Sequence, residues 1–570
     1  MKKTIIILLL ALILLIQLVS AGQGHIKLLT VIEDGNQSRG GTADLYLDIR
    51  PGSGRVFIDS FPLTKVDTQI STRFAKEVAC DFLDQDCSNK DFFYTIRAKS
   101  PIVGGPSAGA AITILTVSEL SGDKLNNETV ITGTINSGGI IGPVAGIKQK
   151  VQAAMEEGYT KALVPSRSIL EDDATNLTNI TYADSLKIEG IEIITTSTLE
   201  DAYYQFTGKK SKDYSYTITI PESYQNIMGK IANGLCTRYD EILTTIPKKI
   251  LDENNESYNS TIKSINESKI ALIAEDYYSA ASYCFSADTT IRTIQFKGLT
   301  NKSLLKIAEA TNKSATELLQ QINARQLKTM SDLETSIILK ERLLETLDLL
   351  DGNETKVLDQ LGYTVERYNS ALAWSGFFEY PGKEVEINSQ YLASACLSKI
   401  TEAEERLNYV DLLFGATDTK KQELTDAKKS YEEEDYTYCL FKAAKVSADA
   451  NSILLTLAIT KEKVPELIKD LQTQARIQIN KQEKNFPILG YSYYNYANSL
   501  KESRPDLAIV FSEYSAEFSN LDMYFPKKKT FSIDFRPDIL LSVFLGFVLG
   551  AFLTSRIYKK HQNKTSKKRK

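Results

Sequence analysis

The sequence changes character near residue 210, and this change limits what the chain can fold into more than any other feature. From His25 to about Gly208, short β-branched and aromatic runs alternate with amphipathic stretches and glycine turns. From Tyr214 to about Lys529, glycine is scarce, and apolar residues recur at helical spacing in long stretches rich in Lys, Glu, Leu and Ala. The sequence therefore predicts an α/β or α+β domain followed by a mostly helical domain.

Individual elements follow from the periodicity. In the first domain the expected strands are residues 26–32, 45–49, 55–58 and 92–103, and the expected helices are residues 69–82, 108–120 and 147–157. In the second domain, apolar residues between Leu333 and Leu350 cover a wide face, which predicts a buried helix. The related segments Glu275-Asp276-Tyr277-Tyr278 and Glu434-Asp435-Tyr436-Thr437 each open an alanine-rich helix with a cysteine, which hints at duplicated helical hairpins.

Apolar segments near both ends of the sequence predict a location for the protein. A basic start, an apolar stretch and small residues after it predict a signal peptide over residues 1–21, and the alternative is an uncleaved anchor. Residues 539–555 contain no charge and precede a basic tail, residues 556–570, which is typical of a transmembrane helix with a cytoplasmic end. We therefore expect the two domains, residues 25–207 and 212–530, to lie outside the cytoplasm, tethered to the cell membrane.

The overall composition agrees with that placement. With 570 residues, 42% hydrophobic content and a net charge of −5, the chain can bury two or three cores and shows no basic bias toward nucleic acid. Its six cysteines are an even number, which in an oxidising compartment favours disulfides. Cys80 and Cys87 are close enough in sequence to close a small loop, and the connectivity stays open. Asn-x-Ser/Thr sequons would be accessible to glycosylation.

The run Gly-Gly-Pro-Ser-Ala-Gly-Ala, residues 104–110, carries the candidate chemistry. Gly104, Gly105 and Pro106 form a turn at the end of a strand, and the small, apolar residues after them predict a helix with Ser107 at its N-terminus. Free N–H groups and the dipole at a helix N-terminus can stabilise an oxyanion. Two alternatives stay open from this run alone. One is a tight turn capped by a serine, and the other is a phosphate loop, whose Gly-x4-Gly-Lys-Ser/Thr pattern is absent.

A serine nucleophile needs a base, and the sequence offers a lysine. The two histidines, His25 and His561, lie outside the predicted core, which excludes a Ser-His-Asp triad and argues against a metal site. A lysine can act as the base only where burial lowers its pKa from about 10.4 to near 7. At about 100° per residue, Lys148 projects beside Val151, so we expect Lys148 to be buried and Lys150 to be solvated. The alternative is that both are ordinary surface lysines.

The order of four short motifs makes the first domain resemble the proteolytic domain of Lon proteases. The motifs are Gly105-Pro106-Ser107-Ala108-Gly109, Thr132-Gly133, Gly142-Pro143-Val144-Ala145-Gly146-Ile147-Lys148-Gln149-Lys150 and Ala162-Leu163-Val164-Pro165. The resemblance covers about residues 25–207 and implies the α+β Lon protease-domain fold, with Ser107 as nucleophile and Lys148 as general base. It also implies that the Thr132 hydroxyl orients the lysine amine. The backbone groups that would hold the oxyanion and an extended substrate belong to Gly104, Gly105, Pro106 and Ala108.

The chain departs from the Lon pattern in two ways. The acidic residue that often precedes Gly-Pro-Ser in Lon is replaced by Gly104, and Thr-Gly-Glu is replaced by Thr132-Gly133-Thr134, so we expect a charge near the dyad to be missing. The sequence holds no Walker motif, and it resembles the membrane-anchored, ATP-independent Lon-like proteins of archaea. That resemblance implies hydrolysis of unfolded, surface or membrane proteins without ATP, cofactor or metal, and it suggests ring-shaped homo-oligomers.

Other functions remain compatible with the sequence. The alternatives to an active Ser-Lys endopeptidase are a catalytically silent scaffold that binds surface proteins and a surface protein that cleaves itself. In the helical domain, aromatic clusters at residues 374–380 and 491–496 have two interpretations, a sticky groove for substrates or contacts inside the helical core.

Overall fold

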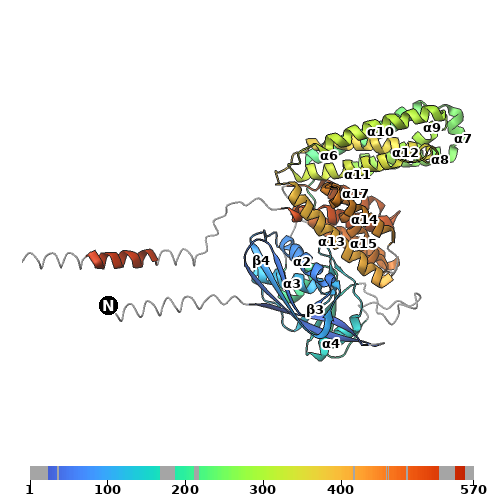
Figure 1. Ribbon diagram of the computed structural model, residues 1–570. Coiled ribbons are helices and arrows are strands. Elements are labelled where there is room, and N and C mark those ends of the chain that lie inside the picture. The colour runs from blue at the N-terminus through green and yellow to red at the C-terminus, as the bar shows by residue number, and fades with distance from the viewer. Residues whose placement is uncertain are drawn as a thin grey trace, which may run out of the picture. The chain divides into compact units, whose positions relative to one another are not determined.

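The computed structural model divides the chain into two compact units, residues 1–526 and 527–570, each of which is treated by itself (Figure 1). The described residues are 23–34, 37–166, 186–210, 217–414, 418–457, 459, 461–482, 485–525 and 546–558. The predicted signal peptide lies outside these ranges, as do most of the predicted basic tail and the first part of the predicted membrane span. In the second unit, residues 546–558 are helical. None of the helices formed by the described residues combines the length and the apolar content that crossing a membrane requires.

A four-stranded sheet forms the frame of the first domain. Its strands, in spatial order, are β1 (Gly24–Asp34), β2 (Gln37–Pro51), β4 (Lys90–Val103) and β3 (Val56–Thr64). Neighbouring strands are antiparallel except for β3 and β4, which run parallel. Every second residue of the central strands faces the core, so that Leu45 and Leu47 on β2 and Phe92, Tyr94 and Ile96 on β4 are at most 1% exposed. The structure confirms all four strands that the β-branched and aromatic runs predict.

Helix α3 (Gly109–Ser121) lies at the centre of this domain. The remaining elements are α2 (Val66–Phe82), β5 (Thr129–Ile131), β6 (Thr134–Ile135), β7 (Ile141–Gly142), α4 (Ile147–Glu156), β8 (Lys161–Pro165), β9 (Glu192–Thr196) and α5 (Leu199–Thr207). Strands β5, β8 and β9 form a second, parallel sheet, and α3 packs against α2, β1, β2 and β5. Every residue of α3 from Gly109 to Ser118 is buried, because the helix contacts both sheets. The α+β fold and the three predicted helices are thereby confirmed.

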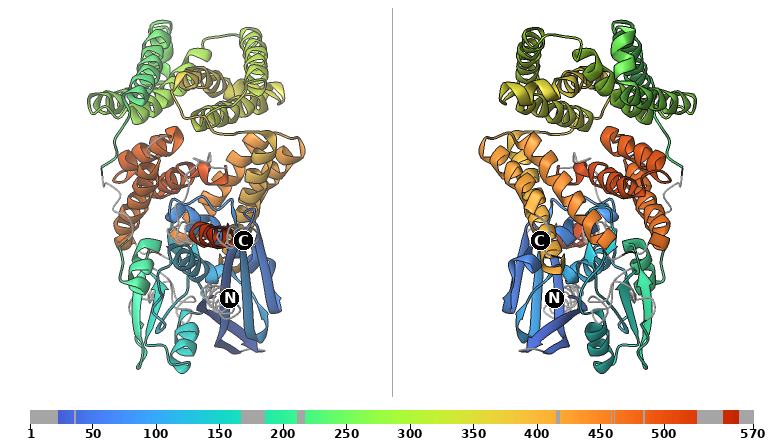
Figure 2. Two further views of the ribbon diagram at one scale, coloured as in Figure 1. Left: turned by 90° about the vertical axis from the view of Figure 1, so that its left-hand side faces the viewer. Right: turned by 90° about the vertical axis from the view of Figure 1, so that its right-hand side faces the viewer.

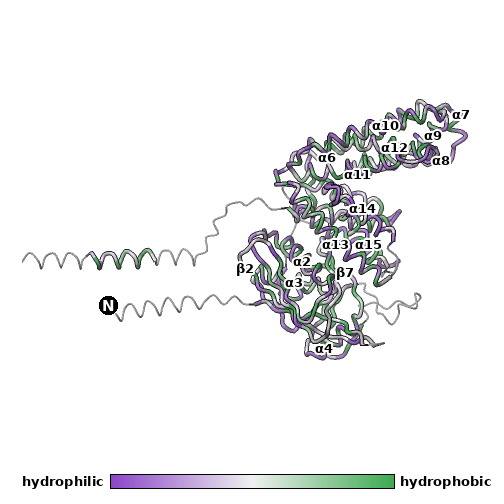
Figure 3. The backbone as a smooth tube through the Cα atoms, viewed as in Figure 1, coloured by the Kyte–Doolittle hydropathy of each residue, from purple (hydrophilic) through white to green (hydrophobic). Residues whose placement is uncertain are grey.

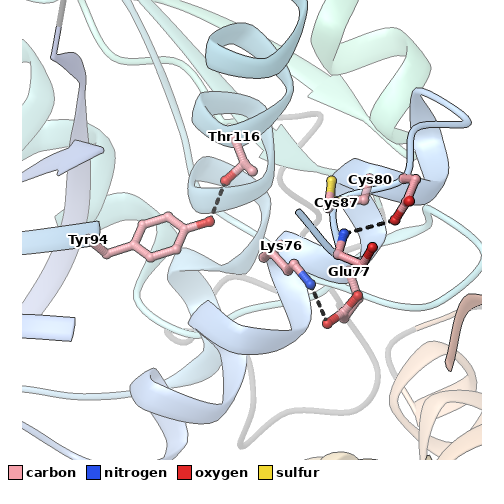
Figure 4. Close-up of a disulfide and its surroundings, with 8 residues drawn as sticks. Lys76, Glu77, Cys80, Cys87, Tyr94 and Thr116 are labelled. Carbon is pink, nitrogen blue, oxygen red and sulfur yellow. Dashed lines mark hydrogen bonds and ion pairs between the residues drawn. A yellow bond between two sulfur atoms is a disulfide. The ribbon is translucent and has the colours of Figure 1, made fainter. Parts of the chain in front are cut away.

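Side-chain bonds fix α2 and β4 to this core (Figure 4). The disulfide between Cys80 and Cys87 joins the end of α2 to the segment before β4, as their spacing predicts. Tyr94 on β4 shares a hydrogen bond of 2.8 Å with Thr116 on α3, and burial raises the pKa of the tyrosine. The strand that leads to the candidate nucleophile is therefore fixed to the helix that follows it.

The second domain is helical, as the sequence predicts. Its helices are α6 (Glu222–Thr244), α7 (Lys248–Glu253), α8 (Asn255–Ile273), α9 (Tyr277–Phe296), α10 (Asn301–Asn323), α11 (Met330–Leu350), α12 (Glu354–Trp374), α13 (Ser389–Phe414), α14 (Asp418–Glu432), α15 (Tyr436–Leu457), α16 (Val464–Lys481), α17 (Ile488–Leu500) and α18 (Pro505–Phe518). Figure 3 shows hydrophilic and hydrophobic residues alternating along these helices, as amphipathic packing requires. Helix α11 fully buries Leu333, Ile337, Leu339 and Leu343, which confirms its wide buried face.

The aromatic clusters belong to the core of the helical domain. Trp374 and Phe377 are 2% and 0% exposed, and Tyr491 is 5% exposed. The ring of Tyr224 lies 5.7 Å from the ring of Phe377 and 5.1 Å from that of Tyr491, so the two clusters meet inside the domain. The core interpretation is confirmed for these residues, and the groove interpretation is wrong, because their rings are already covered by one another.

Two turns of the helical domain repeat the same design. Glu275 and Glu434 both have a positive φ, 57° and 63°. In each case the next residue, Asp276 or Asp435, accepts a hydrogen bond at its carboxylate from the N–H three residues further on, which caps the following helix. The two related sequence segments therefore form the same turn and cap.

The two hairpins that contain these turns also have corresponding disulfides. Cys284, on the helix after the first turn, is bonded to Cys236 on α6, and Cys439, on the helix after the second turn, is bonded to Cys396 on α13. In both cases a disulfide joins the second helix of the hairpin to a helix that precedes the hairpin. The arrangement supports duplicated hairpins, and the expectation of disulfides is confirmed.

The two domains meet through buried charged residues on α13 and α18. Helix α13 packs against α2, and α15 packs against β7. In Figure 2 the orange helices of the second domain adjoin the blue elements of the first. Lys399 on α13 is fully buried and forms ion pairs with Glu402, at 2.6 Å, and with Glu517 on α18. A buried lysine keeps its charge only with such partners, so these carboxylates are required where the domains join.

The carboxyl group of Glu513 on α18 predicts a pH dependence of stability. Its burial and the charge of Glu517 raise its pKa to about 8, against the hydrogen bond with Asn136 and the nearby charge of Arg406. The folded protein keeps this proton up to about pH 8, whereas the unfolded chain releases it near a pKa of about 4.3, so raising the pH through this window favours unfolding. Between about pH 5 and 8, the unfolding free energy of wild type should fall with rising pH more steeply than that of Glu513→Gln. We expect the two slopes, measured by urea denaturation, to differ by about 1.4 kcal/mol per pH unit. Identical slopes for wild type and variant would contradict this assignment.

Candidate active site

The candidate nucleophile lies in a sharp turn between β4 and α3. Gly104 and Gly105 lead from the strand into one 3-10 turn, Pro106–Ala108, which continues directly into α3. Gly105 has a φ of 99°, a conformation that glycine adopts without strain but that other residues avoid. The turn places Ser107, half-buried, immediately before the N-terminus of α3, as the sequence predicts.

The surroundings of Ser107 suit an oxyanion. Pro106 and Ala108 are buried, whereas Gly104 is exposed and Gly105 is half-buried. The N–H groups that open a helix have no acceptor within that helix, and the helix dipole favours a negative charge beside them. The Gly109 and Ala110 N–H groups already donate to the Pro106 and Gly133 carbonyl oxygens. A substrate carbonyl that reached Ser107 past the two glycines would therefore meet the N–H groups of the 3-10 turn that opens α3.

Two residues at the start of α2 hold this turn, and neither belongs to a motif of the sequence. The Asp67 carboxylate accepts a hydrogen bond of 3.0 Å from the Gly105 N–H, and the Thr68 hydroxyl lies 3.4 Å from the Gly105 carbonyl oxygen. The expectation that a charge near the dyad is missing is wrong, because Asp67 supplies one from another element. The only signal in the sequence is an acidic residue in the first turn of a helix.

Thr132 and Gly133 hold the nucleophile from the other side. The Thr132 hydroxyl donates to the Ser107 carbonyl oxygen at 3.3 Å, and the Gly133 N–H donates to the same oxygen at 2.9 Å. Ala110 in α3 donates its N–H to the Gly133 carbonyl oxygen at 3.0 Å, which completes a two-way link. Thr132 is therefore part of the site, but the hydrogen bond of its hydroxyl goes to the backbone of the nucleophile.

The two lysines of α4 have the opposite burial from the prediction. Lys150 is 4% exposed, whereas Lys148 is exposed to solvent. The buried face of α4 contains Ile147, Val151 and Ala154, and Lys150 projects within this face, while Lys148 projects on the far side of Val151. The expectation that Lys148 is buried and Lys150 solvated is wrong, because the helix turns its Ile147 side to the core.

The backbone of α4 lies in close contact with the first sheet. At Gly40 on β2, an added Cβ would lie 1.9 Å from the Gln149 carbonyl oxygen, so only glycine allows the helix to approach this closely. Gly146, with φ of 67°, precedes the helix, and its carbonyl oxygen accepts the Lys150 N–H at 2.9 Å. The position of Lys150 therefore depends on the residues that fix the backbone around Gly146.

No metal site accompanies this arrangement in the part of the chain that the structure describes. No group of three or more His, Cys, Asp or Glu side chains is arranged there to hold a metal ion.

Comparisons with known proteins agree with this geometry. Residues 89–202 match the model of the Lon protease (S16) C-terminal proteolytic domain. A Lon protease of Paraburkholderia phytofirmans is 36% identical over 136 residues, which are 22% of this chain and 17% of that protein. A Lon protease of Methylocella silvestris is 48% identical over 64 residues, 11% of this chain and 8% of the relative. The Archaeal Lon protease of Methanocaldococcus jannaschii is 26% identical over 118 residues, 21% of this chain and 16% of that relative.

The likeness is confined to one part of each protein. The chain spans less than a fifth of the length of these three curated relatives, and the matched segment of 89–202 includes Ser107, Thr132 and Lys150. Lon-type proteolytic domains are serine endopeptidases with a Ser-Lys dyad. The N-terminal α+β part of the chain is thus a Lon protease (S16) C-terminal proteolytic domain.

Proposed function

We propose that this protein is a serine endopeptidase in which Ser107 is the nucleophile and Lys150 the general base. The observation that carries the proposal is the combination of a half-buried serine at the N-terminus of α3 with a buried lysine on α4, both inside the segment that matches the Lon proteolytic domain. Lys148, although it belongs to the same motif, is exposed to solvent, so the lysine of this motif that the structure buries is Lys150.

In this mechanism, neutral Lys150 removes the proton from the Ser107 hydroxyl as the oxygen attacks the substrate carbonyl carbon. N–H groups of the 3-10 turn that opens α3 stabilise the oxyanion that forms. The protonated lysine then gives its proton to the leaving amine, and an acyl-enzyme remains on Ser107. Water, deprotonated by the same lysine, hydrolyses this ester and restores the free serine.

The register of the first sheet supports binding of an extended polypeptide. Pairing between β2 and β4 stops at Ala43 with Ala98, whereas β3 stays paired with β4 as far as Thr64 with Val103. We propose that a substrate strand pairs with β4 between residues 99 and 103, on the edge that faces away from β3. Such a strand would run directly toward Ser107 with its backbone held by β4.

The conditions of the reaction follow from the sequence. No Gly-x4-Gly-Lys-Ser/Thr motif occurs in these 570 residues, so we propose that they hydrolyse unfolded or loosely folded polypeptides without ATP. The predicted signal peptide and the apolar segment at 539–555 support a location on the outer side of a membrane, where misfolded surface and membrane proteins would be the substrates. Ring-shaped oligomers stay a prediction from the resemblance to Lon.

Cleavage of an unfolded, fluorescently labelled protein by the full chain tests this proposal. We expect cleavage by wild type without ATP and in the presence of EDTA, and complete loss in Ser107→Ala. Ser88→Ala, a change at an exposed serine outside the site, should cleave like wild type. A folded wild-type protein that cleaves nothing over a range of pH would favour the scaffold alternative, and fragments of the protein itself that vanish in Ser107→Ala would favour self-cleavage.

A further inference from the structure

A segment of the proteolytic domain is inserted into the helical domain. This segment, residues 134–146, contains β6, a turn, β7 and the residues that lead into α4. At its tip Ile140 is 3% exposed and lies in one apolar cluster with Leu467 and Leu471 of α16 and Ile509 of α18. The tip of the 134–146 segment is therefore packed into the apolar core of the other domain.

Polar side chains of α18 surround the same tip. Asn136 donates its side-chain N–H to the Glu513 carboxylate, with distances of 3.2 and 3.4 Å to the two oxygens, and the Ser137 hydroxyl donates to Glu517 at 2.5 Å. The carbonyl oxygen of Ser137 accepts a hydrogen bond of 3.1 Å from Asn520. The segment is thus held by directional bonds as well as by apolar contact, which fixes its position more closely than apolar contact alone.

Three residues within two turns of α13, which we call the clamp residues, reach different parts of the active site. The Tyr409 hydroxyl accepts the Ala145 N–H at 3.3 Å, and the buried Arg406 guanidinium donates to the Ile135 carbonyl oxygen. Glu405 accepts a hydrogen bond of 3.5 Å from Ser71. The clamp residues Glu405, Arg406 and Tyr409 therefore contact α2 and both ends of the 134–146 segment.

Each contact lies a short distance along the chain from the dyad. Ala145 immediately precedes Gly146, whose carbonyl oxygen accepts the Lys150 N–H. On the other side, Ile135 follows Thr132 and Gly133, the two residues that hold the Ser107 carbonyl oxygen.

The contact with α2 leads to the same turn. Ser71 is one helical turn after Asp67, whose carboxylate accepts the Gly105 N–H beside the nucleophile. Helix α13 also packs directly against α2. All three clamp residues thus contact segments whose backbone positions Ser107 or Lys150.

We propose that the helical domain is an internal part of the catalytic machinery, and that Tyr409 and Arg406 are positioning residues that set the distance between Lys150 and Ser107. The inference rests on the proposed function, because it concerns the same dyad. The bonds of Tyr409 to Ala145 and of Arg406 to Ile135 both go to backbone groups. Tyr409 holds the residue before the cap of α4, Arg406 holds the strand that supports Ser107, and both do so from one rigid helix.

The decisive variant is Tyr409→Phe, which removes one hydroxyl and leaves the ring in place. We expect a tenfold to hundredfold fall in kcat, because small displacements of a catalytic group are costly. We also expect the acidic limb of the pH profile of kcat/KM to move to higher pH, because a looser α4 admits water to Lys150 and water favours the charged amine. If the variant only folded less completely, kcat/KM would be lower at every pH, and the pH at which the acidic limb falls would not change.

Tyr239→Phe is the matched control, because the Tyr239 hydroxyl is also buried but bonds to Thr261 within the helical domain. Its activity and pH profile should equal those of wild type. If Tyr409→Phe does not fold, Arg406→Lys is the second variant, which keeps the charge but changes the reach of the donor. Arg406→Lys should show the same shift of the pH profile of kcat/KM, and an unshifted profile would overturn the proposed role of the clamp residues.

Hydrogen exchange of the full chain separates this inference from the proposed function. In Tyr409→Phe the amides of residues 140–150 should exchange at least tenfold faster than in wild type, while α11 should be unchanged. This result stands whether or not the protein cleaves a substrate. Unchanged exchange and unchanged cleavage would overturn the clamp and leave the protease, whereas faster exchange in a protein whose wild type cleaves nothing would keep the clamp and reject the protease.

Discussion

Replacing Lys150 by alanine is expected to lower kcat/KM for an unfolded protein substrate by at least about a thousandfold, because the reaction would lose the general base that we propose for Ser107. Lys150→Arg should be equally inactive, since a guanidinium stays charged at any pH at which the protein is folded. Lys150→Ala should retain the thermal unfolding temperature of wild type or exceed it, because an alanine no longer requires burial of an amine. Cleavage of a quenched fluorescent protein measures the effect.

Lys148→Ala is the internal control for this prediction. The two lysines belong to the same helix and differ in burial, so the same substitution at Lys148 should leave kcat/KM within about twofold of wild type. The opposite result, an inactive Lys148→Ala with an active Lys150→Ala, would show that α4 is rotated in solution relative to the position described here, and it would reject Lys150 as the base.

Loss of the disulfide between Cys236 and Cys284 is expected to have the largest effect on stability. This bond closes a loop with a sequence separation of 48 residues between α6 and α9, and its removal raises the entropy of the unfolded chain. The chain-entropy relation gives a loss of about 4 kcal/mol for a loop of this size. Urea denaturation of the double variant Cys236→Ala/Cys284→Ala, compared with wild type, measures the difference.

The pair Cys80 and Cys87 offers a matched comparison. Its sequence separation is 7 residues, for which the same relation gives about 2 kcal/mol, so Cys80→Ala/Cys87→Ala should be the less damaging of the two double variants. Equal losses in the two variants would mean that restriction of the unfolded chain does not set the contribution of these bonds. In that case the packing of the sulfur atoms in the native state would dominate.

The sequence predicts the local parts of this protein well. The strands around Ser107 follow from β-branched and aromatic runs, the helices from a period of 3.6 residues, and the turn at Gly105 from two glycines and a proline, because these signals arise within short segments. The choice between Lys148 and Lys150 is different. Both lysines flank the apolar stripe of α4, and the alanine residues of the helix give little indication of which flank is buried. The rotation of α4 about its axis is therefore decided by its packing on the first sheet.

Other parts of the site depend on contacts between distant segments. Asp67 precedes Gly105 by 38 positions, and Arg406 follows Ile135 by 271 positions, so no local pattern connects them. An aspartate in the first turn of a helix is usually explained by the helix dipole, and a buried arginine in a helical domain by an ion pair. Only the tertiary structure shows that both residues contact the backbone of the active site.

The burial of Ile140 among the side chains of α16 and α18 has a consequence for genetics. A change of volume at Leu467 or Ile509 alters the pocket that holds a residue more than 300 positions earlier in the chain. Loss-of-function alleles should therefore arise in the helical half as readily as around Ser107, and substitutions at Ile140 should suppress some of them. In an evolving lineage, the two halves would have to be inherited and adjusted as one unit, because the residues buried between them need side chains from both.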